Sequence, residues 1–153
     1  MAVYLITGGA HGIGAEIAVR LHGAGNSILF ADIERVELPG VRSVICDLTD
    51  EGQVASLLFG VEAVEGRLDG IVCHPSNSTD EDDFASTGLL INAAAGLLRQ
   101  PRGAAVAVHH GGPAALPVLT RNLARDLGPE IRVNCIAPCG TEHIDNLAAY
   151  LMG

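Results

Sequence analysis

Short apolar stretches alternate with stretches of helical spacing along almost the whole chain of 153 residues. The six apolar stretches cover residues 3–7, 27–31, 41–46, 68–73, 104–108 and 131–136, and each is expected to form a strand. Residues 13–21, 54–61, 89–98 and 116–127 carry apolar side chains three and four positions apart, which predicts helices. Strands that are apolar throughout and alternate with helices indicate a parallel sheet covered on both faces. The sequence therefore predicts an α/β fold with a doubly wound parallel sheet.

The composition limits the classes of partner and compartment. With 48% hydrophobic residues and a length near 150, we expect one domain over 1–153 with a sizeable core. The formal charge of −9 argues against nucleic acid as a partner, because phosphate binding needs a basic face. No apolar run approaches the ~18 residues of a membrane span. The first cationic residue is Arg20, so no secretory signal is expected. The four cysteines show no C-x-x-C spacing, so we expect reduced thiols and a cytoplasmic location.

A glycine-rich turn joins the first expected strand to the first expected helix. Gly8 permits the sharp turn, Gly12 permits close approach of a pyrophosphate to the backbone, and Gly14 permits tight packing of the helix on the strand. The helix that follows offers free N–H groups and the positive end of its dipole. Asp32 ends the second strand about 20 residues further on, where a carboxylate would accept a hydrogen bond from a ribose hydroxyl. This pattern is typical of a Rossmann-like dinucleotide site.

With Thr7 before these glycines, the sequence resembles the short-chain dehydrogenase/reductase family, whose T-G-x-x-x-G-x-G motif is complete. Residues 46–50 look like the adenine-contacting stretch of the family, and residues 131–138 match its I-R-V-N-x-I-x-P strand. The resemblance implies NAD as the cofactor, since the Asp32 carboxylate would repel the 2′-phosphate of NADP. The cofactor-binding residues that it implies are Thr7, Gly8, His11, Gly12, Ile13, Gly14, Asp32, Asp47, Leu48 and Cys73.

The chain departs from the family where the family keeps its chemistry. All nine basic residues are arginines, so the Tyr-x-x-x-Lys motif, whose phenol acts as general acid or base, is missing. The only tyrosines are Tyr4 and Tyr150, and the N-N-A-G turn is replaced by residues 73–76. A shortened single domain without the usual catalytic pair is therefore expected.

Histidines follow the expected strands where that chemistry would lie. Three residues are candidate catalytic groups: Asn92, which aligns with the active-site Asn of the family, and His109 and His110, which could act as acid–base groups. Cys139 and His143 have ligand types and spacing that zinc accepts, although our prediction is that no metal is bound. Ordinary loop residues without a chemical role are the third interpretation.

Three functions remain open. The first is a dinucleotide-binding protein, related to NAD-dependent oxidoreductases that act on carbonyl or alcohol groups, with catalysis lost or altered. The second is an active oxidoreductase that uses His109 or His110, on a small-molecule substrate that the sequence does not identify. The third is an inactive assembly or regulatory subunit. Family members associate through helices that correspond to residues 89–98 and 116–127, so a homo-oligomer is expected.

Overall fold

The computed structural model describes residues 1–8, 12–74, 81–99, 101–108, 115–136 and 142–153. Its strands are β1 (Val3–Thr7), β2 (Ser27–Asp32), β3 (Arg42–Ile45), β4 (Gly70–Cys73), β5 (Ala104–Val108) and β6 (Arg132–Ile136). Its helices are α1 (Ile13–Gly23), α2 (Glu51–Glu65), α3 (Glu81–Arg99), α4 (Ala115–Leu127) and α5 (Glu142–Met152). No helix among these residues is long and apolar enough to cross a membrane.

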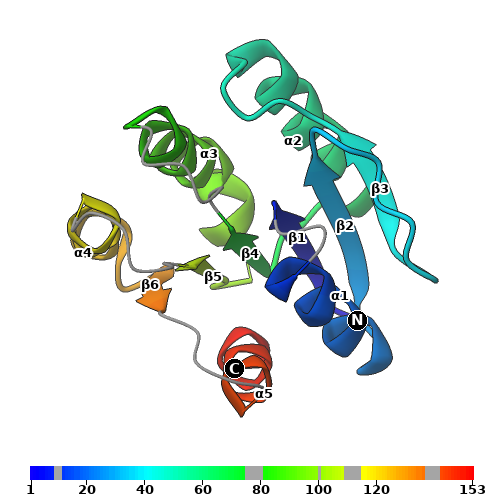
Figure 1. Cartoon of the computed structure of the whole chain (residues 1–153). Coiled ribbons are helices and arrows are strands. Elements are labelled where there is room, and N and C mark those ends of the chain that lie inside the picture. Colours follow the sequence, from blue (N-terminus) through cyan, green and yellow to red (C-terminus); the bar gives the residue numbers. More distant parts are fainter. Residues whose placement is uncertain (9–11, 75–80, 100, 109–114, 137–141) are drawn as a thin grey trace.

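All six strands pair in parallel, in the order β3-β2-β1-β4-β5-β6. Helices α2, α3 and α4 cover one face of the sheet, and α1 and α5 cover the other (Figure 1). Successive residues of a strand point to opposite faces, so Leu5 joins the core under α2 and α3 while Tyr4 and Ile6 join the core under α1 and α5. The predicted doubly wound, Rossmann-like α/β fold is confirmed.

Helix α3 and strand β4 are among the elements whose bounds differ from their sequence patterns. Helix α3 begins at Glu81, eight residues before the apolar periodicity at 89–98. Its first turns contain three acidic residues and a single large apolar residue, so periodicity does not mark them. Strand β4 begins at Gly70 instead of residue 68. Asp69 stands before the strand, where its carboxylate accepts hydrogen bonds from Val3 N at 2.8 Å and from the Arg67 guanidinium.

Helix α5 is fastened to the sheet at its carboxyl end. The buried Tyr4 hydroxyl donates to Leu151 O at 3.2 Å. Arg132 donates to Tyr150 O at 3.0 Å, and its guanidinium lies 4.7 Å from the centre of the Tyr150 ring. Cations near the last carbonyl groups of a helix oppose the negative end of its dipole. Helix α5 is thus an integral part of the core.

Candidate dinucleotide site

The turn after β1 brings the carboxyl ends of three strands together. Thr7 is buried, and its register partners are Ala31 in β2 and Cys73 in β4. Gly8 has φ +72 and donates from its N–H to Ala31 O at 3.3 Å. In an open parallel sheet, ligands bind outside these carboxyl ends, where the strand order reverses direction. β1 and its neighbour β4 form this reversal point here.

The amino end of α1 is suited to an anion. Gly12 precedes the helix and supplies no side-chain hydrogen bond to its first N–H groups. A Cβ built on Gly12 would meet no described atom within 4 Å. The glycine therefore leaves open space beside the uncapped end of a helix, which is the setting in which backbone N–H groups bind phosphates. Ile13 begins the helix, and Gly14 is buried within it.

Asp32 ends β2 beside this turn. Its Oδ1 accepts from Glu34 N at 3.2 Å, and its backbone oxygen accepts from Cys46 N at 2.9 Å. These two bonds hold a half-buried carboxylate at the carboxyl edge of the sheet. A carboxylate held in this way can accept from a sugar hydroxyl, and Glu34 adds a second negative charge two residues away.

Asp47 is held in a local hydrogen-bond network after β3. Its Oδ1 accepts from Thr49 N at 2.9 Å and Thr49 Oγ1 at 2.7 Å, and these bonds lower the pKa of the Asp47 carboxyl. The Asp47 amide donates to Gln53 Oε1 at 2.8 Å. Asp50 caps α2 by accepting from Gly52 N and Gln53 N. The half-buried Leu48 packs against the core. The loop is therefore preorganised to keep the Asp47 carboxylate ionised.

Gln53 was missed as a supporting residue, and its spacing from Asp50 could have identified it. Asp-x-x-Gln has the spacing of a capping box. In this chain the Gln53 side chain reaches back to the amide of Asp47 and also donates to Asp50 Oδ2 at 3.3 Å. It therefore joins the cap of α2 to the predicted adenine loop.

Cys73 and His74 form the β4 side of the site. The Cys73 side chain is fully buried, and this burial raises the pKa of its thiol to about 12. It can therefore face a ligand only with its backbone. The His74 amide donates to Thr7 O at 2.8 Å. Nine of the predicted cofactor residues thus end or follow neighbouring strands: Thr7, Gly8, Gly12, Ile13, Gly14, Asp32, Asp47, Leu48 and Cys73. The tenth, His11, lies outside the described residues.

Of the three predicted catalytic residues, Asn92 lies in the part of the chain that the structure describes. Asn92 is exposed on α3, between the sheet-facing residues Ile91 and Ala94. His109 and His110 lie outside the described residues, as does Cys139, the first of the alternative zinc ligands. Among the described side chains, no group of three or more His, Cys, Asp or Glu could hold a metal.

Both tyrosines lie far from the carboxyl edge. Tyr4 precedes Thr7 by three residues, or about 10 Å along a strand, and its hydroxyl is bonded to the end of α5. Tyr150 contacts Arg132, the first residue of β6. Neither phenol therefore faces the turn after β1. The three cysteines that the structure describes, Cys46, Cys73 and Cys135, are free thiols.

Comparisons with known proteins identify the family to which this protein belongs. No protein-family model matches the chain. (+)-Borneol dehydrogenase 1 of Salvia officinalis is 31% identical over 179 residues, covering 90% of this chain and 69% of the relative. L-fucose dehydrogenase of Bos taurus is 30% identical, covering 89% of this chain and 64% of the relative. The chain therefore spans about two thirds of the length of these relatives.

Solved structures agree with this class. Levodione reductase superimposes with a TM-score of 0.70 at 26% identity, over 90% of this chain and 70% of that one. A Serratia marcescens short-chain dehydrogenase/reductase superimposes with a TM-score of 0.75 at 21% identity, over 99% of this chain and 90% of that one. The protein belongs to the short-chain dehydrogenase/reductase family. Members of this family are oxidoreductases that use a nicotinamide dinucleotide and act on small molecules.

The match with the borneol dehydrogenase also shows where the two chains differ in length. Its aligned region of 179 residues is longer than this whole chain of 153. The relative therefore carries segments inside the matched region that this chain lacks.

Proposed function

We propose that this protein binds NAD at the carboxyl edge of β1, β2 and β4, as a single Rossmann-like unit. The observation that carries the proposal is the open space at Gly12 beside the uncapped amino end of α1. The pyrophosphate would lie there and accept from backbone N–H groups. The ribose would donate to Asp32, and the adenine would lie near Asp47 and Leu48. When bound, the dinucleotide supplies a hydride acceptor or donor.

The preference for NAD over NADP rests on charge. Asp32 and Glu34 stand together at the end of β2, so a 2′-phosphate there would meet two carboxylates. Like charges at close range repel, and a carboxylate cannot donate a hydrogen bond to a phosphate oxygen. The same carboxylate accepts well from a ribose hydroxyl.

Calorimetric titration of the purified protein with NAD, NADH and NADP tests this proposal. We expect Asp32→Ala to weaken NAD binding about 10- to 100-fold, the range of one or two lost hydrogen bonds to a charged group. NADP binding should strengthen, because one of the two carboxylates that repel its 2′-phosphate is removed, so the two affinities should converge. Glu37→Ala is the matched control, because it removes one exposed acidic charge from the same loop. Equal binding of NAD by Asp32→Ala and wild type would contradict the proposed ribose contact, and no binding by wild type would contradict the site.

Catalysis in this protein would need a group other than a family-type Tyr–Lys pair. The sequence contains no lysine, and both tyrosines lie at other positions in the fold. A binding protein with lost or altered oxidoreductase chemistry agrees best with these facts. The alternative enzyme uses His109 or His110 as acid–base, with Asn92 as relay. It predicts NADH formation from secondary alcohols that His110→Ala or His109→Ala abolishes while calorimetric binding of NAD is kept.

Assembly and location complete the proposal. Helix α3 presents the exposed residues Leu89, Ala93 and Gly96 next to α4, and a homo-oligomer could form through this face, hereafter the α3–α4 face. An inactive assembly or regulatory subunit would keep such contacts without turnover.

The free thiols of the three described cysteines support a reducing cytoplasmic location.

A further inference from the structure

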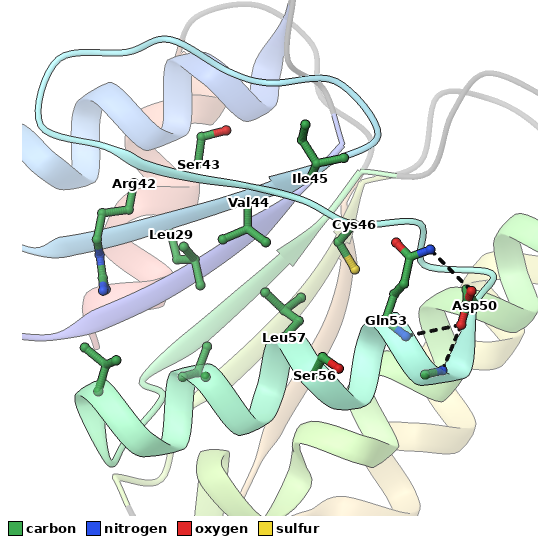
Figure 2. Close-up of a pocket in the computed structure, with 14 residues that line it drawn as sticks. Leu29, Arg42, Ser43, Val44, Ile45, Cys46, Asp50, Gln53, Ser56 and Leu57 are labelled. Atoms are coloured by element: carbon green, nitrogen blue, oxygen red, sulfur yellow. Dashed lines mark hydrogen bonds between the residues drawn. The ribbon is translucent and has the colours of Figure 1, made fainter.

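A groove separates β3 from α2 on the side of the molecule away from β6. Among the described strands β3 pairs only with β2, so its other edge is not paired within the sheet. The groove encloses about 750 Å³ between this strand and the helix. Figure 2 shows Leu29, Val44 and Leu57 directed into the space between the two elements. The groove is therefore an apolar hollow that lies beside the unpaired edge of β3.

The rim of the groove is apolar and exposed. Val44 is 37% exposed on the strand, and Val64 is 70% exposed on the helix. Natural edge strands are protected by short length, lysine, proline, a bulge or an inward-pointing charge, and β3 has only its length of four residues and one arginine for protection. β3 reads Arg-Ser-Val-Ile, and Arg42 is its one charged residue. An edge of this kind is a template on which another strand can pair.

Gly60 is a second, independent feature. It lies in the middle of α2, is exposed, and a Cβ built on it would meet no described atom within 4 Å. Glycine at such a position destabilises a helix relative to alanine. Nothing among the described residues of the chain itself requires the missing side chain. Ser56 and Gly52 lie one and two turns earlier on the same side, so a chain lying in the groove could approach the helix backbone closely.

We propose that a second copy of this chain docks in this groove, with β3 of each copy running antiparallel to the other across a two-fold axis centred near Val44. The two sheets then become one. The α2 helices lie side by side on the same face, with their small residues in contact and Val64 covering the junction. A two-fold interface must be self-complementary. This patch meets that requirement, because the unpaired edge of β3 pairs with the same edge of the partner and α2 packs against the same helix of the partner.

The charges at the ends of β3 favour the antiparallel direction. Arg42 begins the strand, where it pairs with Glu65 and donates to Ser27 Oγ at 3.3 Å. Asp47 and Asp50 follow the other end of the strand. Antiparallel pairing brings the Arg42–Glu65 pair of one copy to the acidic end of its partner, whereas a parallel arrangement would bring the acidic ends of the two copies together.

The test is the mass of the native protein in solution, measured by sedimentation velocity and light scattering from micromolar concentrations upward. The wild type should self-associate. Val44→Lys should add two buried charges at the axis, and Gly60→Arg should fill the groove. Each should raise the dissociation constant of the β3 contact at least about 10-fold, which corresponds to about 1.4 kcal/mol.

The matched controls carry the same substitutions at exposed positions elsewhere. Val118→Lys on α4 and Gly96→Arg on α3 should leave the β3 contact intact, even if they weaken an association through the α3–α4 face. Circular dichroism and thermal unfolding establish that all four variants are folded. Gly60→Arg is the safer of the two test variants, since its Cβ has open space. A monomeric wild type, or test variants with the wild-type mass, would overturn the proposal.

A cross-linking experiment reads out the register directly. Opposed residues of antiparallel strands have Cβ atoms about 4.5–5.5 Å apart, near enough for a disulfide after a small adjustment. With Cys135 and Cys139 replaced by serine, Val44→Cys should form a covalent dimer under mild oxidation. Val118→Cys in the same background is the control and should not. Failure of Val44→Cys to cross-link in a protein that does dimerise would contradict an axis near Val44.

Neither experiment depends on the cofactor. Loss of the dimer with intact NAD binding, or the reverse, separates this proposal from the proposed function.

Discussion

The carbonyl oxygen of His74 lies against Gly8 so closely that a Cβ on Gly8 would be 2.1 Å from it. The hydrogen bond from the His74 amide to Thr7 O holds the same segment next to the end of β1. Gly8 also has φ +72, a conformation that L side chains rarely adopt. The turn after β1 is therefore shaped jointly by its own glycine and by the chain that leaves β4.

A non-glycine residue in the left-handed conformation costs about 1–2 kcal/mol. We expect Gly8→Ala to lower the free energy of unfolding by more than this, because the methyl group also displaces His74. Binding of NAD should be lost with it. Gly25→Ala is the control, since Gly25 has φ +90 but a Cβ there meets no described atom within 4 Å. Urea unfolding of both variants measures the difference, and equal losses would show that the contact with His74 is unimportant.

Burial of Cys73 predicts sensitivity to alkali. Its pKa rises from 9.0 to about 12 on folding, so the unfolded thiol ionises first as pH increases. Stability from this group is complete below pH 9 and is lost as pH rises towards 12, by up to about 1.4 kcal/mol per pH unit. Cys73→Ser should flatten this decline in urea unfolding between neutral and alkaline pH. Some slope should remain, because burial also raises the pKa values of Cys46 and Tyr4. An unchanged slope in Cys73→Ser would contradict the assignment.

The fastening of α5 predicts a difference between the two tyrosines. Tyr4→Phe removes the donor to Leu151 O inside the core and should destabilise the protein by about 1 kcal/mol. Hydrogen exchange should increase in α5. Tyr150→Phe keeps the ring beneath Arg132 and should change stability by less than half as much. Thermal unfolding and exchange of both variants check this, and a greater loss in Tyr150→Phe would indicate that the hydroxyl of Tyr150 carries the contact instead.

Much of the fold could be predicted because its signals are local. The apolar stretches at 3–7 and 104–108 coincide with β1 and β5, and the helical spacing at 116–127 lies within α4. The start of α3 could not be located from periodicity, since residues 81–88 contain one large apolar residue and no apolar stripe. The length of β4 was overestimated because Leu68 is buried beside the strand without pairing in it.

The candidate site was predictable only in part. Thr7, Gly8 and Asp32 follow from the motif and its distance from the second strand, and the strand order brings them to one edge. The support that Gln53 gives to Asp47 arises from a side chain that folds back over six residues, which the resemblance alone does not show. Asn92 matches a family position, yet it lies on the exposed side of α3, and its role as a relay stays a prediction.

The sequence by itself determined which segments form strands and helices and where a phosphate could meet the backbone, because periodicity and glycine geometry act over a few neighbouring residues. Only the tertiary structure decided which of these segments meet. The approach of His74 to Gly8, the bond from Tyr4 to Leu151 and the groove beside Val44 join residues far apart in the chain or in separate elements. Such contacts depend on how whole elements pack across the sheet, which no local pattern records.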